Sequence, residues 1–545
     1  MALPKIYAGR RRRLLIRLVG NGVLQAATAF ALASFLHRAL VGARGGDVPW
    51  PLVAGVAASG LVILVLRTAE AGDAERLGQD YVMRVRLRIF ERIARRPFAA
   101  GGRARWGVTM TRLISDLNSL RNWVSEGIAR AIVATITLAG LLGALAWLRS
   151  GATIAAAAMI LLTVAATAAL TPTLRSYVRE ARKRRGRLAN NLGEKVFAFQ
   201  TVRHFGSTAK ELRRVRSHSR QLRDALVRRM RAARVLRSIP VAIKPMAVAL
   251  LIAVVATGDH TGAEIAVAIL LLGMIASALG DLTRAWDYRL AFEEGRRRIG
   301  EVLAGPQLRE DPHAIELPGS GGVAVRFERA AVARRLEPVT LVVQPGEAVL
   351  VCGDSGCGKT TLLALAARML DPDEGEVEID GIPVARLALE SLYTSVQLVG
   401  PSLPLLRGTV AQNLGYGTED LDVEWLETVS KACGLLDADA LLPEGLETPI
   451  AEQGRDLPDG LRARIALARA AARKPRLLLV DDPAFLMDSA AQAALRRILL
   501  TFETTALIVG SEANPPCWVD RIWQLGEPPD PIARAARTAA RAGID

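Results

Sequence analysis

A glycine-rich run in the second half of the chain has residue types and spacing suited to binding phosphate. Gly353 opens the pattern G-x-x-x-x-G-K-T, between a strand-like run at 348–352 and a helix-like run at 361–369. In this setting backbone N–H groups and a helix N-terminus face phosphate oxygens, the lysine reaches the β- and γ-phosphates, and the threonine hydroxyl holds Mg²⁺. A chance glycine-rich turn would need neither the strand nor the helix. The run therefore predicts that ATP and Mg²⁺ are bound by Gly353, Ser355, Gly356, Cys357, Gly358, Lys359, Thr360 and Thr361.

The chain that must position this loop is too apolar for an ordinary soluble enzyme. Of its 545 residues 51% are hydrophobic, and the excess lies in the first 290 residues. Six stretches there are long enough to cross a bilayer, which takes about 20 apolar residues. Buried helices of a large soluble domain are the alternative, but the stretch at 132–148 carries no charge. We place the spans near 18–38, 48–66, 128–148, 152–172, 239–257 and 263–285.

The net charge of +17 is spread unevenly along the chain. Arginine runs lie at 10–13, 182–187 and 213–237, whereas the segments on the other side of the predicted spans are short. Because Lys and Arg stay on the cytoplasmic side of a membrane, both termini and the long polar stretches are predicted to be cytoplasmic. Membrane lipid and solvated helix faces explain the charge better than nucleic acid. We therefore expect an integral protein of a bacterial inner membrane, with its nucleotide-binding domain in the cytoplasm.

The predicted fold class is a membrane α-helical domain of six transmembrane helices followed by an α/β P-loop nucleotide-binding domain. The membrane domain is expected at 1–300, with long cytoplasmic loops at 67–129 and 175–238. Proline and glycine residues then indicate a linker. All four cysteines lie in the C-terminal part and imply no disulfide framework. The remaining segments are the linker at 301–322, the nucleotide-binding domain at 323–528 and a basic Ala/Arg tail at 529–545.

With six spans, two long cytoplasmic loops and a phosphate-loop domain, the chain resembles a half-transporter of the ABC exporter family. The resemblance covers almost the whole length. It implies that two such chains pair, exchange helices and sandwich two ATP molecules, with coupling helices near 101–112 and 204–212. It rests on runs in the family's order and spacing, namely VTLVVQPGEAVLVCGDSGCGKTTLL at 339–363, GTVAQNLGYG at 408–417, TPIAEQG at 448–454, RARIALARAAARKPRLLLVDDP at 462–483, and Asp488.

The chain's own ATP site departs from the family pattern at two positions. A strand-like run at 477–480 ends in Asp481, which the resemblance places to hold Mg²⁺ through water; a solvated strand end is the alternative. The next residue is usually a glutamate that polarises the attacking water, and here it is Asp482. Ser511 stands where the family has a histidine near the γ-phosphate, although a plain loop serine is also consistent. Because a misplacement of about 1 Å costs on the order of 10²-fold in rate, we expect slow hydrolysis.

The loop that faces the partner's ATP is altered as well. Asp459 puts a carboxylate where a γ-phosphate should dock, and Pro458 removes an N–H, so both changes oppose closure. Elsewhere, Pro401 takes the place of a glutamine, and Arg334 takes the place of an aromatic that stacks on adenine. The family's signature sequence LSGGQ corresponds here to Leu457, Pro458, Asp459, Gly460 and Leu461.

These departures leave two functions open. In the first, the chain is a subunit of an ATP-driven exporter that binds Mg·ATP, hydrolyses it weakly and pairs with a second half-transporter, a heterodimer being favoured over a homodimer. In the second, it is a non-hydrolysing membrane pseudo-ATPase that regulates or scaffolds a complex. Turnover coupled to substrate movement separates the two. Asn21, Gln25 and Asp281 could line a path for the unknown substrate, but contacts between helices explain them equally well.

Overall fold

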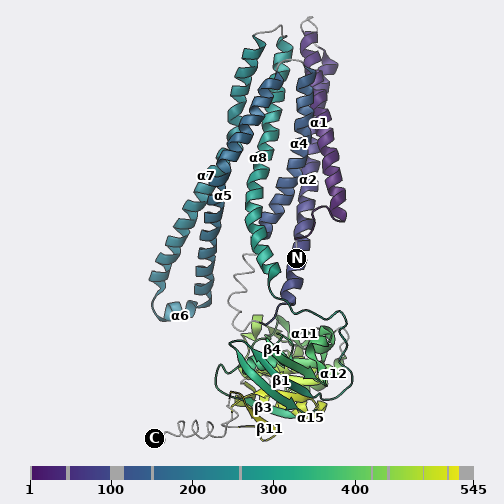
Figure 1. Ribbon diagram of the computed structural model, residues 1–545, viewed down its shortest axis with the longest axis vertical. Coiled ribbons are helices and arrows are strands. Elements are labelled where there is room, and N and C mark those ends of the chain that lie inside the picture. The colour runs from purple at the N-terminus through teal and green to yellow at the C-terminus, as the bar shows by residue number, and fades with distance from the viewer. Residues whose placement is uncertain are drawn as a thin grey trace. The chain divides into compact units, whose positions relative to one another are not determined.

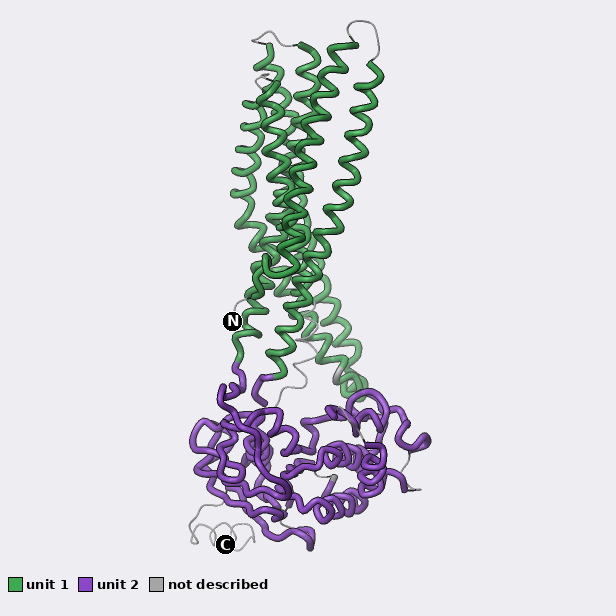
Figure 2. Tube along the Cα trace, turned by 90° about the vertical axis from the view of Figure 1, so that its right-hand side faces the viewer, with its two compact units in different colours: residues 1–94, 101–305 green, residues 95–100, 306–545 purple. Residues whose placement is uncertain are grey.

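The computed structural model describes residues 3–43, 49–98, 116–148, 152–256, 261–418, 422–437, 442–482, 484–511 and 515–526. Contacts divide the chain into two compact units (Figure 2). The first unit holds residues 1–94 and 101–305, and the second holds residues 95–100 and 306–545.

The first unit consists of long helices that lie side by side (Figure 1). Among the described residues, six helical stretches are long and apolar enough to cross a membrane, which confirms the predicted fold class. A π-helical turn, η2, lies within the third of them, directly before α4. The helices are α1 (Arg10–Gly42), α2 (Trp50–Ala94), η2 (Trp123–Ala129), α4 (Arg130–Trp147), α5 (Ala152–Phe197), α6 (Phe199–His204), α7 (Thr208–Val255) and α8 (Gly262–Ala304).

Much of the described part of the polar stretches expected between the spans continues the same helices. α7 has 48 residues, about 72 Å at 1.5 Å per residue, whereas a bilayer core is about 30 Å thick. The chain turns between α5 and α7 through the short α6 and through Gly206, whose φ is 60°. The short helix in this turn lies at Phe199–His204, earlier than the coupling helix expected near 204–212, and its coupling role stays a prediction. The one expected near 101–112 lies outside the described residues.

The hairpin of α5 and α7 is fastened to α8 by apolar and polar contacts. Leu251 of α7 and Leu272 of α8 belong to one buried cluster. In the polar half of these helices, Arg237 pairs with the buried Asp287 at 2.6 Å. The indole Nε1 of Trp286 on α8 donates to the hydroxyl of Thr171 on α5 at 2.8 Å. These contacts hold both arms of the hairpin to the same helix.

The second unit carries two main sheets and a short strand pair. The antiparallel sheet has the order β2-β1-β4-β5, from β1 (Val325–Val332), β2 (Leu336–Val343), β4 (Glu374–Ile379) and β5 (Ile382–Pro383). The parallel sheet has the order β11-β3-β10-β9-β6, from β3 (Ala348–Cys352), β6 (Val396–Val399), β9 (Leu477–Val480), β10 (Thr505–Val509) and β11 (Arg521–Gln524). The short antiparallel pair joins β7 (Gly408–Thr409) and β8 (Pro449–Ile450).

Helices bury the parallel sheet on both faces, which explains its uninterrupted apolar strands. Successive side chains of a strand point to opposite faces. Val349 and Val351 of β3 accordingly pack with leucines of α9, whereas Leu350 packs with α13 and α15. The helices of this unit are α9 (Lys359–Ala366), α10 (Leu389–Ser395), α11 (Val410–Leu414), α12 (Val423–Ala432), α13 (Asp459–Ala471), α14 (Ala484–Met487) and α15 (Ser489–Phe502).

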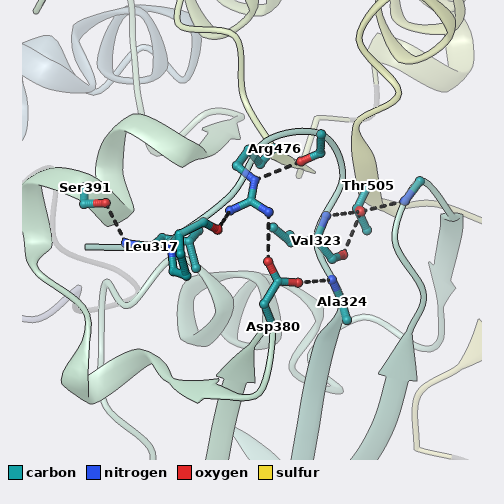
Figure 3. A network of polar contacts seen from close by, with 10 residues as sticks. Leu317, Val323, Ala324, Asp380, Ser391, Arg476 and Thr505 are labelled. Carbon is teal, nitrogen blue, oxygen red and sulfur yellow. Dashed lines mark hydrogen bonds and ion pairs between the residues drawn. The ribbon is translucent and has the colours of Figure 1, made fainter. Parts of the chain in front are cut away.

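Polar contacts fasten the residues before β1 to both sheets (Figure 3). Arg476 donates to Gly321 O at 2.9 Å and pairs with Asp380 at 2.8 Å. The hydroxyl of Thr505 on β10 accepts from the backbone N–H of Val323 at 2.9 Å. The end of the segment expected as a linker is thereby held in place against the strands that carry the site.

Candidate functional site

The predicted nucleotide-binding residues lie at one edge of the parallel sheet. All five strands run in the same direction, so their carboxyl ends meet at that edge. β3 leads directly into the phosphate loop, β9 into Asp481 and Asp482, β10 into Ser511, and β6 into Pro401. The carboxyl edge of a parallel sheet is where α/β domains bind their ligands.

The phosphate loop passes from β3 to the first turn of α9 in a conformation that requires glycine. The φ angles of Gly353, Gly356 and Gly358 are 143°, 91° and 107°. A Cβ on Gly358 would lie 2.6 Å from Arg335 O, so the loop packs directly on the turn between β1 and β2. The ammonium of Lys359 donates to Gly353 O at 2.7 Å. This bond holds the lysine over the loop.

The other predicted loop residues differ in exposure. Ser355 and Gly356 are exposed at the crest of the loop, where their N–H groups are accessible to a phosphate. Cys357 is half-buried, with its Sγ 3.8 Å from Lys359 Nζ. Thr361 is buried within the first turn of α9. Its side chain therefore belongs to the packing below the loop.

Thr360 and Asp481 meet where Mg²⁺ is predicted. The Thr360 side chain lies next to the Asp481 carboxylate. Burial raises the pKa of Asp481 above its ordinary value, and the Thr360 side chain opposes part of that shift. A hydroxyl and a carboxylate are hard oxygen ligands, and Mg²⁺ is bound by few such groups together with water and phosphate oxygens. The residues present therefore fit Mg²⁺.

Asp482 and Ser511 follow neighbouring strands on this edge. The helix α14 begins two residues after Asp482. The backbone O of Asp482 accepts a hydrogen bond from the N–H of Phe485 at 3.2 Å. Ser511 is exposed and follows Gly510, whose N–H donates to Val351 O of β3 at 3.1 Å. The backbone thus brings both residues to the edge that carries the phosphate loop.

The predicted signature residues form the start of α13. Pro458 is the N-cap, Leu457 is half-buried, and Leu461 is buried in the core. Asp459 forms an ion pair with Arg462, one turn along the helix. The Asp459 side chain is 82% exposed, so solvent screens the pair. The Arg462 guanidinium partly offsets the negative charge at this helix end, and the effect of Asp459 on the partner's ATP stays a prediction.

Gly460 packs against Asp488, the residue that caps α15. A Cβ on Gly460 would lie 1.7 Å from Asp488 Oδ2, while Asp488 Oδ1 accepts from Ala491 N at 2.9 Å. Sequence reasoning misses these roles of Asp488 and Arg462. The i, i+3 spacing of Asp459 and Arg462 is a signal for the pair. No local pattern indicates the contact between Gly460 and Asp488.

Two further predicted positions lie next to the loop and to Asp481, a predicted Mg²⁺ ligand. Arg334 is exposed in the turn between β1 and β2, with φ 63°, and precedes the carbonyl that meets Gly358. Its contact with adenine stays a prediction. Pro401 follows Gly400. A Cβ added to Gly400 would lie 3.0 Å from Asp481 O. Pro401 therefore follows a residue in close contact with Asp481 and offers no polar side chain there.

Two family profiles match the chain. The profile of the ABC transporter transmembrane region matches residues 14–279, and the ABC transporter profile matches residues 336–485. The chain is an ABC exporter half-transporter. It joins its transmembrane helices and its ATP-binding domain in one integral membrane protein.

Known proteins resemble the half-transporter along most of its length. The ATP-dependent lipid A-core flippase of Thiobacillus denitrificans is 26% identical over 79% of this chain and 77% of its own. The ATP-dependent lipid A-core flippase of Cupriavidus metallidurans is 25% identical over 94% of this chain and 89% of its own. A multidrug efflux ATP-binding/permease protein of Mycobacterium bovis is 32% identical over 42% of this chain and 19% of its own. A bacterial Atm1-family ABC exporter, solved with ATP bound, has the same fold, with a TM-score of 0.83, 21% identity and coverage of 98% and 99%.

The polar residues considered for a substrate path have partners within the half-transporter. Asn21 on α1 donates to a backbone carbonyl of α2 at 2.9 Å. Gln25 on α1 donates to Glu70 on α2 at 2.8 Å. Asp281 pairs with Arg284 on its own helix at 2.5 Å. The contacts of Asn21 and Gln25 favour a structural role in joining α1 to α2.

Proposed function

We propose that this half-transporter binds Mg·ATP through its phosphate loop, hydrolyses it slowly and acts as one subunit of an ATP-driven exporter. The observation that carries the proposal is the composition of one sheet edge. Lys359, Thr360 and Asp481 lie there with the charge and ligands that Mg·ATP requires. Asp482 and Ser511 lie on the same edge and replace the longer side chains typical of the family. Binding groups are thus present where hydrolytic groups are shortened.

Slow hydrolysis follows from the reach of these two side chains. A general base must come within hydrogen-bond distance of the water that it activates. Asp482 is one methylene shorter than glutamate, and a misplacement of about 1 Å costs on the order of 10²-fold. Ser511 cannot carry the positive charge with which an imidazolium stabilises a charged transition state. Both changes slow turnover while leaving the binding groups in place.

We further propose that the second subunit is a different half-transporter. A homodimer would place Asp482, Ser511 and Asp459 in both of its composite sites. The ion pair of Asp459 with Arg462 reduces the charge penalty at the signature helix. It restores neither the serine hydroxyl nor the N–H that is lost at Pro458. In a heterodimer each altered residue occurs only once, and the second half-transporter can supply the groups that this chain lacks.

Co-expression with a related half-transporter tests the pairing. The two full-length chains are expected to co-purify and to show higher ATPase activity than either chain alone. Asp482→Glu with Ser511→His should raise the rate at this chain's own site, and Pro458→Ser with Asp459→Gly should raise it at the partner's site. A homodimer that hydrolyses ATP at a normal rate with these residues unchanged would contradict the proposal. A complex that binds ATP without substrate-coupled turnover would support a regulatory pseudo-ATPase instead.

We also propose that the transported substrate is a lipid. Two relatives that match over 79% and 94% of this chain are named as lipid A-core flippases, whereas the relative named for multidrug efflux matches over 42%. The test is the ATPase activity of the complex reconstituted in phosphatidylcholine vesicles. Added lipid A should stimulate turnover. Stimulation by a cationic drug and by no lipid would overturn this part of the proposal.

A further inference from the structure

One exposed face of α7 carries a line of arginines. Their spacings of three, four, three, eight and three residues keep them on one side of a helix. The opposite side holds Ala225, Ala233 and Leu236, which are buried. All members of the line are exposed: Arg213, Arg216, Arg220, Arg223, Arg231 and Arg234, called here the arginine line.

Most of the arginine line has no neutralising carboxylate. Arg223 pairs with Asp224 at 2.8 Å, and the other five have no ion pair in the part of the chain that the structure describes. The stretch 175–238 contains twenty Arg and Lys residues and four Asp and Glu residues, a net charge of +16 out of +17 for the whole chain. Such a surface repels itself, and a bound polyanion would relieve that repulsion.

The same face of α7 becomes apolar beyond Arg234. It continues through four exposed residues spaced by four, four and three. Since α7 ends at Val255 and a bilayer core takes about 20 helical residues, the change falls near the bilayer boundary. The face thus offers apolar contact at membrane depth and positive charge below it. The four apolar residues are Val241, Pro245, Ala249 and Ile252.

The arginine line is too long for the headgroups of ordinary phospholipids. From Arg213 to Arg234 it spans about 32 Å at 1.5 Å per residue. A headgroup layer is roughly 5–8 Å deep, and charges are screened within about 8 Å at physiological salt. Along the helix, Arg220 lies about 21 Å from Arg234, on the side away from the bilayer. Bilayer headgroups therefore account for the upper arginines, Arg231 and Arg234, but not for the lower ones.

Among the described helices, α2 and α5 of a second copy would present mainly positive charge to the arginine line. The exposed residues on the polar half of α2 include Arg76, Arg84 and Arg86. Those on α5 include Lys183 and Arg187. Like charges brought together at an interface oppose association. The continuity of the line with an apolar stretch instead matches an amphiphile.

We propose that this face of α7 binds an anionic lipid whose long headgroup carries several negative charges. The acyl chains contact the stretch from Val241 to Ile252, and the anionic groups of the headgroup follow the arginine line away from the bilayer. The inference rests on the proposed lipid substrate and goes further by naming the class of headgroup and the face that binds it.

Binding to the full-length protein in phosphatidylcholine nanodiscs tests the site. The probes are lipid A with its phosphorylated core, lipid A without core, and phosphatidylglycerol. The lower variant is Arg213→Gln/Arg216→Gln/Arg220→Gln, and the upper variant is Arg231→Gln/Arg234→Gln. The control Arg12→Gln/Arg13→Gln/Arg86→Gln removes three exposed arginines from α1 and α2. Binding of a fluorescent ATP analogue and the Tm show that each variant is folded.

The lower variant is expected to bind core-bearing lipid A about tenfold more weakly and lipid A without core as the unchanged protein does. The upper variant should weaken binding of both forms, and the control neither. Unchanged affinity of the lower variant for the core-bearing lipid would overturn the inference. So would a loss of dimer in the lower variant, or tighter binding of RNA than of lipid. If the unchanged protein bound none of the three lipids, the lipid substrate itself would be wrong.

Discussion

Lys359 is held over the phosphate loop by hydrogen bonds to two backbone carbonyls, Gly353 O at 2.7 Å and Asp354 O at 2.9 Å. Its charge is expected to contribute to nucleotide binding more than to folding, because exposed backbone carbonyls can bond to water instead. Lys359→Ala should abolish binding of a fluorescent ATP analogue to the full-length protein and change the Tm by less than about 2 °C. Lys431→Ala, which removes an exposed lysine on α12, should leave binding unchanged. Retained affinity in Lys359→Ala would contradict the assigned role.

The raised pKa of Asp481 links stability to nucleotide binding. Because burial raises this pKa, the folded domain binds the proton more readily than the unfolded chain does, and the ionised carboxylate lowers stability at neutral pH. Asp481→Asn should therefore raise the Tm without nucleotide at pH 7.5. The gain should shrink as the pH falls toward the raised pKa, where the unchanged side chain is protonated. The same variant should lose the stabilisation that Mg·ATP gives the unchanged protein. A lower Tm without nucleotide would mean that the carboxylate is mainly a structural acceptor.

Single residues differ in how well the sequence predicts their placement. Lys359 and Thr360 are predictable because a short loop between a strand and a helix restricts their positions. The ion pair of Asp459 with Arg462 is readable from helical spacing once the start of α13 is known. The contact of Gly460 with Asp488 joins residues 28 apart and depends on how α13 packs on α15. Side-chain periodicity carries no information about such a contact.

At the scale of elements, the first turn of α13 combines a helix N-terminus with an opposing charge. A helix N-terminus favours an anion, and Asp459 with Arg462 modifies that field. Arg462→Ala should lower the ATPase activity of the assembled transporter about twofold to fivefold at the partner's site. In an Asp459→Asn background the same change should have a smaller effect, since no carboxylate is left to offset. Equal effects in both backgrounds would show that Arg462 acts independently of Asp459.

The segment before β1 is predicted to depend on Arg476 for its placement. This side chain is 12% exposed and donates to Pro318 O at 2.7 Å and Gly321 O at 2.9 Å, besides pairing with Asp380. Arg476→Ala should cost about 2 kcal/mol of stability, measured by thermal unfolding, because two carbonyls and a carboxylate lose a charged donor. Arg497→Ala is the control, since its bonds are at 3.3 Å or longer. A cost no larger than that of the control would refute the anchoring role.

The sequence predicts helices and strands better than the turns that connect them. Apolar runs and the loop pattern indicate β3, α9 and β9, because each has one periodicity along its length. The turn between α5 and α7 is less predictable, since the same polar composition continues through α5, α6 and α7. The start of the short helix there depends on where the chain leaves helical geometry, at Ala198.

For the whole molecule, the orientation of the helices is predicted from the distribution of arginines. Ala43 and Ala209 are both exposed, at the end of α1 and the start of α7. In a cysteine-free background, Ala43→Cys should react with an impermeant maleimide added outside intact cells, and Ala209→Cys only after lysis. Labelling of Ala209→Cys from outside would invert the assignment. Replacing the cysteines also removes Cys517, which is exposed and would otherwise react after lysis.

The division into two units is only partly visible in the sequence. The change in composition near residue 300 marks it, because apolar spans give way to a mixture of strands and amphipathic helices. The sequence gives no sign that residues 95–100 group with the second unit. There Phe98 N donates to Met369 O at 2.6 Å, and Arg95 O accepts from Leu308 N at 2.9 Å. These bonds join positions more than 200 residues apart, which no local pattern encodes.

The positive charge of the α5–α7 hairpin also has a consequence for how the chain enters the membrane. Moving one elementary charge across a potential of 100 mV costs about 2.3 kcal/mol. For the net +16 of residues 175–238, outward transfer against an inside-negative potential would cost roughly 37 kcal/mol per 100 mV. If the hairpin is cytoplasmic, as predicted, we expect the membrane potential to oppose its transfer outward during synthesis. An energised membrane would then favour this topology before any of the helices have packed.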